Sequence, residues 1–339
     1  MMRQILMVCA AGIVVGGVLA AAPPPAPRVA ALKLDATPVP LNPEDPAQQR
    51  VGRLRYLGGV VLRSPDAAFG GLSGLRARGD WLLAVSDTGN WVAWRTIEVR
   101  GRLVGVTGGR IAPLLDEAGR PAAAKELGDA EALTWAADGS VAVSFEQDHR
   151  IQLYAGIDPT TPASLGAHAT RTLRYAATGG WLDNGGGEAL VALSDGGTLW
   201  FQEEGQDADG WSPVLRLAAS GTVETLRYRP PAGYRPTDAI ELSPGEVLVL
   251  NRRFTPTEGV SAVLTTASVA PNMAAVEVAR LSTPLTVDNF EGLTLRREGR
   301  RTFVYLVSDD NFLGLQRTLL LKFELLAATS PKTSIQAQR

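Results

Sequence analysis

The sequence is poor in the residue types on which many active sites depend. Its 339 residues include one cysteine, Cys9, and two histidines, His149 and His168. Because Cys9 lies in an N-terminal apolar run, the rest of the chain has no disulfide, no cysteine nucleophile and no cysteine ligand for zinc. The sequence also has no G-x-S-x-G, Walker A or G-x-G-x-x-G motif. Any catalytic chemistry must therefore use other groups.

The chain also lacks an excess of charge of either sign. It has 33 basic and 35 acidic residues, which gives a formal net charge of -2 at pH 7. No basic block stands out, so the sequence shows no electrostatic footprint for nucleic acid or for an anionic membrane surface. A charged site must be local, and we expect no nucleic-acid partner.

Only the N-terminus has a long apolar run. Arg3 precedes the run Ile5–Leu19, which small residues follow, and this order is typical of a secretory signal peptide. The run is shorter than the roughly 20 residues that a membrane-spanning helix needs. We therefore predict a signal peptide over residues 1–22, an exported protein that is periplasmic or secreted, and no stable membrane insertion after its removal.

The remaining chain divides by composition into three parts. Residues 23–50 are rich in proline and lack periodicity, which predicts an extended tether. Residues 328–339 form a polar tail that we expect to be disordered. Between them, residues 51–327 have short apolar runs separated by Gly, Pro and Asp turns, with little helical period. This pattern predicts a single all-β domain.

A hairpin pattern recurs within this domain. Each copy has a small or acidic entry, an apolar strand, a tight turn and a second strand that ends in a polar residue. The copies recur at intervals of roughly 50 to 60 residues, and their anchors are Ser73, Glu131, Glu188, Asp238 and Glu291. Such a period predicts a β-propeller with five recognisable blades and room for a sixth; a β-sandwich with similar hairpins is the alternative. Ring closure should pair residues 51–62 with residues 317–326.

The hairpins also share acidic ends. Residues at equal distances from a hairpin turn lie at the same end of the hairpin, as Glu131 and Glu146 do about Asp138 and Gly139. If these hairpins form the inner strands of blades, their ends meet at one mouth of the central channel. Oxygen ligands favour a hard cation, and calcium tolerates irregular carboxylate sets best. The alternative is that these acidic residues only lie at strand ends, where they form salt bridges with arginines. The predicted metal ligands are Asp87, Glu131, Glu146, Glu188, Glu203, Asp238, Glu291, Asp309 and Asp310.

Four further residues are candidates for catalysis at this mouth. His149 follows Glu146 closely and is a candidate acid or base, whereas His168 lies in a loop that we expect to be exposed. Three arginines leave the same hairpin ends and can bind an anionic group through two hydrogen bonds, or can form salt bridges with the acids. These arginines are Arg150, Arg252 and Arg253.

At these residues the sequence resembles the phytase-like propeller proteins described as "esterase-like activity of phytase". The matching segments are "LSGL" with "AVSDTG", "DAEALTW" with "VSFE", "GGGEAL", "VLVLNRRF", and "NFEGL" followed by "VSDDNFLGLQRTLLLKFEL". The resemblance spans Gly70 to Leu325. It implies a secreted β-propeller whose acidic mouth binds calcium and acts on phosphate esters. Members commonly read Leu-Glu-Arg where this chain has Leu250, Asn251 and Arg252, so the fourth blade departs from the family pattern.

These observations lead to one main hypothesis and two alternatives. The main hypothesis is an exported, calcium-dependent hydrolase that acts on a small anionic substrate such as a phosphate ester, with metal and water in place of a protein nucleophile. The first alternative is a propeller of the cell envelope that binds a ligand or a protein without catalysis. The second is a lactonase-like or carboxylesterase-like propeller hydrolase.

The N-terminal pattern predicts cleavage after Ala20 or Ala22 during export. Mass spectrometry of the protein recovered from the periplasm or the medium should show a chain that begins at one of the two following residues and has lost Cys9. An exported pool that still contains Met1 would contradict the prediction.

Overall fold

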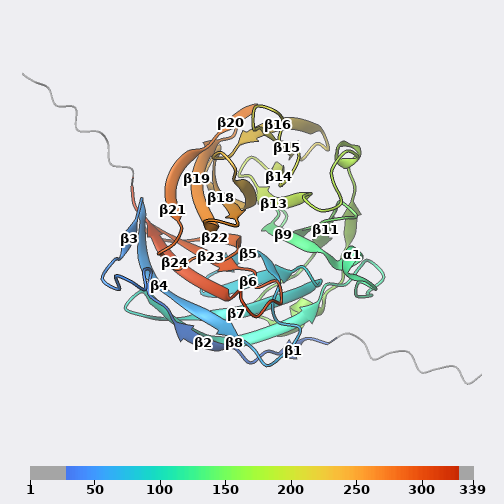
Figure 1. Cartoon of the computed structure of the whole chain (residues 1–339). Helices are drawn as coiled ribbons and strands as arrows, with labels where there is room; N and C mark the ends of the chain where they lie inside the picture. Colours follow the sequence, from blue (N-terminus) through green and yellow to red (C-terminus); the bar gives the residue numbers. More distant parts are fainter. Residues whose placement is uncertain (1–27, 328–339) are drawn as a thin grey trace, which may run out of the picture.

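The computed structural model describes residues 28–327, and these residues form five sheets around a common centre (Figure 1). The predicted signal peptide, the first part of the predicted tether and the predicted tail, residues 1–27 and 328–339, lie outside this range. Among the described residues, no helix is long and apolar enough to cross a membrane.

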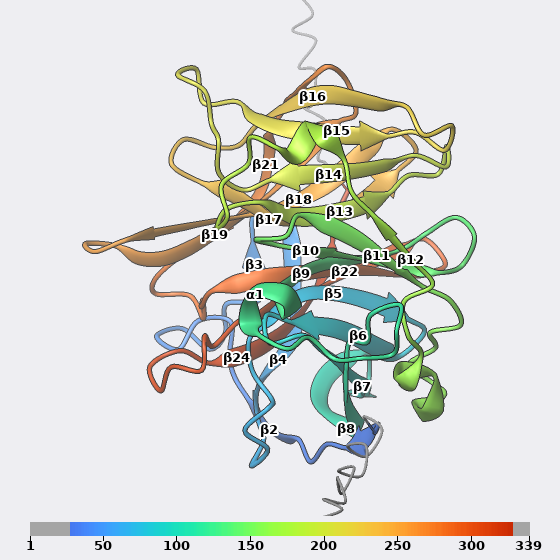
Figure 2. The same cartoon turned by 90° about the vertical axis from the view of Figure 1, so that its right-hand side faces the viewer.

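Each sheet is a blade whose strands follow one another outward from the centre. In Figure 2, β13 to β16 run outward toward the top and β5 to β8 toward the bottom. From the centre outward, blade 1 contains β5 (Leu72–Arg78), β6 (Trp81–Ser86), β7 (Asn90–Val99), β8 (Arg102–Pro113) and β1 (Ala30–Ala31). Blade 2 contains β9 (Ala130–Trp135), β10 (Val141–Phe145), β11 (Arg150–Tyr154) and β12 (Arg171–Leu173).

The other three blades repeat this plan. Blade 3 contains β13 (Gly187–Ala192), β14 (Thr198–Gln202), β15 (Ser212–Leu217), β16 (Val223–Arg229) and β20 (Asn272–Ala274). Blade 4 contains β17 (Arg235–Ser243), β18 (Glu246–Thr255), β19 (Gly259–Ser268) and β21 (Val276–Leu281). Blade 5 contains β22 (Phe290–Glu298), β23 (Arg301–Ser308), β24 (Thr318–Leu325), β4 (Leu54–Arg63) and β2 (Asp35–Pro38), with β3 (Arg50–Val51) beside β4. Helical structure in the described chain is limited to α1 (Lys125–Gly128) and the 3-10 turns Pro162–Gly166 and Ala176–Thr178.

The ring closes within blade 5. β24 from the C-terminal part pairs in antiparallel fashion with β4 from the N-terminal part, and Leu320 lies opposite Val60. This pairing removes the free edges that an open array would expose. The structure thus confirms the predicted propeller and its closure, sets the number of blades in the described chain at five, and excludes the β-sandwich.

Residues 28–50 lie in the segment predicted as an extended tether, and they pair with two blades. They are extended, as their proline content suggests, but β1 pairs with β8 and β2 pairs with β4. Leu41, which lies between these short strands and β4 in the sequence, is fully buried. The segment therefore covers the outer edges of blades 1 and 5, where unpaired backbone groups would otherwise face water.

The apolar core of the described chain consists of five clusters, one at each interface between neighbouring blades. Because a blade packs against a neighbour on both faces, its inner strands are apolar on both sides, as in the run Leu82–Val85 of β6. Trp200, for example, is an inner-strand residue that packs with Leu190 and Leu215 at the interface between blades 2 and 3. This packing sets the distance between the inner strands and hence the width of the channel.

The inner strands approach one another closely enough to require small residues. A Cβ atom at Gly292 of β22 would lie 2.5 Å from Cγ1 of Val307 and 3.0 Å from Cβ of Leu75. The first of these atoms belongs to the same blade and the second to blade 1. The close approach leaves no room for even one methyl group unless the strands move.

We therefore expect Gly292→Ala to lower the free energy of unfolding by roughly 1–3 kcal/mol, the usual cost of overpacking a core. Gly314→Ala is the matched control, because a Cβ at Gly314 would meet no atom within 4 Å. Urea denaturation of both variants checks this, and equal stability of the two variants would contradict it.

Candidate functional site at the channel mouth

A β-bulge occurs near the start of every inner strand. In each blade the register between the first and second strand shifts by one residue, which leaves one residue of the inner strand without a partner. A bulge bends the strand and redirects a side chain. The five unpaired residues are Ser73, Glu131, Glu188, Thr237 and Glu291.

The second strand of each hairpin reaches the mouth at the same level, and in blade 4 it continues beyond the mouth to Thr255. The residue that directly follows the last pair before the bulge is Asp87, Glu146, Glu203, Arg252 or Asp309. All five side chains, together with four of the bulge residues, line one cavity of about 200 Å³ at the channel mouth. The structure therefore brings together the predicted residues Asp87, Glu131, Glu146, Glu188, Glu203, Glu291, Asp309 and Arg252.

The cavity also contains residues that the sequence reasoning missed. Asp129, Lys125, Asn184 and Asn311 line it as well. Asp129 is two residues before Glu131, and alternate residues of an extended segment point to the same side. The spacing in "DAEALTW" could therefore have indicated it. Lys125 had no such signal, because it begins the short helix α1 outside the hairpin pattern, and only the fold brings this helix to the mouth.

Three carboxylates of blade 2 form the tightest group at the mouth. One oxygen from each of Asp129, Glu131 and Glu146 lies within 4.8 Å of the others. Gln147 donates from Nε2 to Asp129 at 2.8 Å. Glu146 accepts hydrogen bonds from the backbone N–H groups of Gly185 and Gly186. Neighbouring groups thus orient two members of this group.

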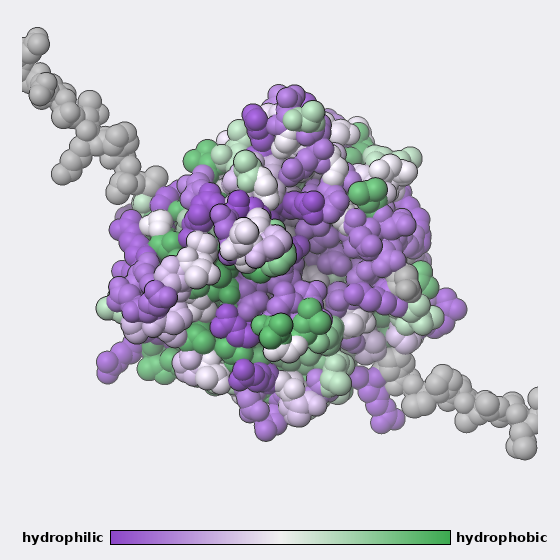
Figure 3. Space-filling view, viewed as in Figure 1, coloured by the Kyte–Doolittle hydropathy of each residue, from purple (hydrophilic) through white to green (hydrophobic). Residues whose placement is uncertain are grey.

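Two cations stand among the eight carboxylates of the mouth, and both are paired. Arg252 lies with Nη2 at 3.0 Å from Glu203 and with Nε at 3.1 Å from Glu291. Lys125 donates to Asp87 at 2.9 Å. The mouth therefore carries a large excess of acidic groups, and hydrophilic residues extend over much of the face seen in Figure 3.

Burial and mutual repulsion shift the titration of these acids. Burial, with the charges of neighbouring carboxylates, raises the pKa of both Glu131 and Glu188 well above the usual range. Burial raises the pKa of Glu291 to about 8, although Arg252 opposes the shift. Burial likewise raises the pKa of Asp309 to about 7. Without a bound cation, several of these groups hold a proton at neutral pH.

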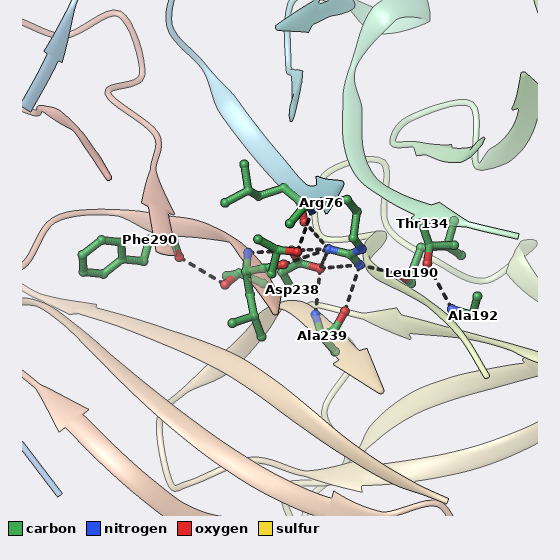
Figure 4. Close-up of polar contacts among 12 residues, drawn as sticks. Arg76, Thr134, Leu190, Ala192, Asp238, Ala239 and Phe290 are labelled. Atoms are coloured by element: carbon green, nitrogen blue, oxygen red, sulfur yellow. Dashed lines mark hydrogen bonds and ion pairs between the residues drawn. The ribbon is translucent and has the colours of Figure 1, made fainter. Parts of the chain in front are cut away.

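Asp238 does not lie at the mouth, so its prediction as a metal ligand there is wrong. It is fully buried in the channel, where it forms an ion pair with Arg76 at 2.9 Å (Figure 4). The reason is the position of the bulge: in blade 4 it falls on Thr237, so Asp238 is already part of the regular ladder. Arg76 also donates to the backbone carbonyls of Leu75, Leu190, Ala239 and Leu293.

Two more predicted residues point away because neighbours in an extended chain alternate in direction. Arg253 follows Arg252 but stacks on Tyr234, 4.9 Å from the ring centroid, and pairs with Glu258. Asp310 follows Asp309 but accepts hydrogen bonds from Thr318 and from the backbone N–H of Gly71. Both therefore support local structure outside the cavity.

His149 and Arg150 also lie outside the mouth cavity. The left-handed backbone of Gln147, with φ of 58°, turns the chain after Glu146. His149 then packs edge-on against Trp181, with ring centroids 5.6 Å apart. The guanidinium of Arg150 lies 4.0 Å from the ring centroid of Phe145 and lines a separate cavity. His168 is exposed, as expected, and lies beside Leu115.

The fold and the site define a five-bladed β-propeller with an acidic channel mouth. The family model for phytase-like proteins, described as "Esterase-like activity of phytase", matches residues 67–312. The chain belongs to this family, and the match includes all the residues that line the mouth. No curated protein matches the sequence.

Solved structures with a similar fold share little sequence with this chain. The catalytic domain of an α-L-arabinofuranosidase from Coprinopsis cinerea has 12% identity and a TM-score of 0.49, over 82% of this chain and 99% of that one. A gluconolactonase from Xanthomonas campestris has 13% identity and a TM-score of 0.42, over 88% and 98%. Virginiamycin B lyase from Staphylococcus aureus has 8% identity and a TM-score of 0.41, over 87% and 100%.

The raised pKa values predict that the metal-free protein loses stability as the pH rises. A carboxyl group with a raised pKa binds its proton more tightly in the folded state than in the unfolded state. Its stabilising effect is complete below the unfolded pKa, about 4, and is lost as the pH passes the folded values of about 7 for Asp309 and about 8 for Glu291. In chelator, the urea midpoint should fall between about pH 5 and pH 8.

Glu291→Gln should reduce this slope, because the variant has one titrating group fewer. Glu224→Gln is the control, since Glu224 is exposed on β16, and it should leave the slope unchanged. A midpoint that is constant or rises over the same pH range would contradict the account of the mouth.

Proposed function

We propose that the protein is a metal-dependent hydrolase of phosphate esters and that the acidic mouth is its active site. The observation that carries this proposal is the group of Asp129, Glu131 and Glu146 at the mouth. It lies within the segment that matches the phytase-like family. Mutual repulsion makes such a local concentration of carboxylates costly unless protons or a cation balance it.

The donor groups at the mouth suit a hard divalent cation. Among the described residues that line the cavity, the charged ligands are carboxylates, and no cysteine or histidine is present. Calcium accepts several carboxylate and amide oxygens in irregular arrangements, which makes it the cation that we propose. Asp129, Glu131 and Glu146 would hold it. When bound, such a cation polarises a phosphoryl oxygen and neutralises developing negative charge.

Arg252 would orient the ester. Two of its three guanidinium nitrogens face Glu203 and Glu291, which leaves Nη1 to donate to an oxygen of the substrate. The two carboxylates fix the plane of the guanidinium, so it does not need to be ordered when the ester binds. Lys125, paired with Asp87, adds a second positive charge on the other side of the mouth.

Asp309 would supply a proton to the leaving group. The backbone N–H of Asn311 donates to Oδ1 of Asp309 at 2.6 Å, so Oδ2 is the oxygen that can carry the proton. A pKa of about 7 suits a general acid that works near neutral pH. Asp309 would thus protonate the leaving alkoxide, and the ordered Asn311 loop would hold its carboxyl group in place.

One observation favours a second candidate, a propeller that binds ligands without catalysis. Both cations of the mouth are already paired with carboxylates, so the metal-free cavity attracts cations more than anions. Carboxylic esters or lactones are a further possible substrate class, which the description of the family as esterase-like supports. We also propose that the protein acts after export, as the N-terminal sequence predicts.

Calcium should stabilise the folded protein, because only the folded chain brings the three ligands together. We expect the melting temperature to rise when calcium is added to chelator-treated protein. Glu131→Gln should abolish most of this rise, whereas the exposed-site control Glu224→Gln should keep it. An unchanged melting temperature of the unsubstituted protein in saturating calcium would contradict the proposed metal site.

Catalysis is tested with a panel of chromogenic phosphate and carboxylic esters in calcium. We expect turnover of a phosphate ester, and Asp309→Asn should lower kcat by roughly 100-fold through loss of the proton donor. Glu224→Gln should retain full activity. Turnover of carboxylic esters alone would shift the assignment to that substrate class. Calcium binding without turnover of any ester would instead support the binding propeller.

A further inference from the structure

Blade 4 differs from the other blades at the mouth. Its bulge residue is Thr237, which is buried and donates to the backbone carbonyl of Phe290 at 3.2 Å. At the matching position of its second strand, which continues to Thr255, it has Arg252, where every other blade has an aspartate or a glutamate. Among the residues that line the cavity, blade 4 therefore contributes a cation and no carboxylate.

The strand register explains why Asn251, the residue before Arg252, does not lie at the mouth. Asn251 pairs with Pro236 across the hairpin, and its side chain is fully buried. It accepts a hydrogen bond from Tyr228 and donates to the backbone carbonyl of Val263. Asn251 thus belongs to the interior of the blades, and Arg252 is the residue that occupies the mouth position.

Arg252 connects the two neighbouring blades. It contacts Glu203 of blade 3 at 3.0 Å and Glu291 of blade 5 at 3.1 Å. The charges of these carboxylates, with that of Glu291 first, raise the pKa of Arg252, so the guanidinium stays charged despite its burial. Nη2 donates to Glu203, whereas Nε lies within ion-pair distance of Glu291 without a hydrogen bond, an arrangement that the planar guanidinium permits and a lysine ammonium makes with less defined geometry.

The opposite side of the mouth has no such partner. The described group Asp129, Glu131 and Glu146 lies on blade 2, and the remaining cation of the cavity, Lys125, bonds Asp87 of blade 1. On this side no guanidinium bridges two blades, because Lys125 pairs with Asp87 while its charge also acts on Asp129 and Glu131.

We propose that Arg252 is a built-in counter-ion that takes the place of a second metal ion between blades 3 and 5. It limits the mouth to one divalent cation and confines that cation to blade 2. In this role Arg252 is a positioning residue, because it decides where the metal lies and keeps Glu203 and Glu291 from binding it. The inference rests on the proposed metal site, but it makes a separate prediction about stoichiometry.

Removal of the guanidinium should open the second position. Glu203 and Glu291 would then be two buried carboxylates without a partner, and such groups must bind protons or recruit a cation. In saturating calcium, the cation competes with protons for these two carboxylates. The number of bound ions is thus a direct measure of what Arg252 does.

The experiment is calcium titration calorimetry, with equilibrium dialysis as a check, on protein freed of metal by a chelator. We expect one ion per chain for the unsubstituted protein and for Arg252→Lys, which keeps the charge. Arg252→Gln should bind two ions. Adding Glu203→Gln to Arg252→Gln should bring the number back to one, because it removes a ligand of the second ion.

The outcomes separate this proposal from the proposed function. If both the unsubstituted protein and Arg252→Gln bind one ion, the counter-ion role is overturned and the blade 2 site stands. If the unsubstituted protein binds none and Arg252→Gln binds one, the counter-ion role stands and the proposed metal-dependent function fails. No binding by either protein would overturn both.

Folding provides a second readout if Arg252→Gln does not fold in chelator. The proposal then expects calcium to restore its native circular dichroism spectrum, because the second ion replaces the lost charge. If calcium does not restore this spectrum while the double variant with Glu203→Gln folds normally, the guanidinium is needed for a reason other than its charge and the proposal is overturned.

Discussion

The ion pair between Arg76 and Asp238 at the centre of the propeller is the interaction on which the rest of the structure depends. The inner strand of each blade has a neighbour on one side only, so part of its backbone carbonyl groups face the channel without a strand partner. Arg76 donates to carbonyls of β5, β13, β17 and β22, which are four of the five inner strands. A guanidinium suits this task because it offers five N–H donors in one plane.

Asp238 makes this arrangement possible in a buried position. It neutralises Arg76, and it also accepts hydrogen bonds from the backbone N–H groups of Leu293 and Ala239. Burial raises the pKa of Asp238 to about 6, which leaves it ionised at neutral pH. The pair is therefore locally neutral, and every polar atom of the two side chains except Nε of Arg76 has a hydrogen-bond partner, conditions under which a buried ion pair is tolerated. It contributes no net charge to balance the acids at the mouth.

The pair thus has two consequences for the mouth. It fills the channel next to the inner strands, so the bulge residues Glu131, Glu188 and Glu291 are shielded from water on that side. It also uses Arg76, the arginine of the inner strands that is buried in the channel. The acids that remain must share protons, pair with Arg252 or Lys125, or bind a cation, and their raised pKa values reflect this constraint.

The architecture could be predicted from the sequence because repeated hairpins and alternating apolar residues determine it. The five hairpins, the closure through residues 51–62 and most of the acidic ring followed from spacing and hairpin symmetry. Most of what failed depended on a shift of one residue, whereas His149 and Arg150 were turned away by the left-handed backbone of Gln147. The bulge at Thr237 moved Asp238 into the channel, and alternation along the strand turned Arg253 and Asp310 away. Spacing alone does not show where a bulge falls.

The central claim is that the mouth holds one divalent cation on blade 2. A crystal structure of the protein grown with manganese, whose anomalous signal locates the ion, tests it most directly. The account predicts a single anomalous peak in contact with carboxylate oxygens of Asp129, Glu131 and Glu146, with Arg252 still between Glu203 and Glu291. A peak between Glu203 and Glu291 with Arg252 displaced, or no peak at the mouth in saturating manganese, would contradict it.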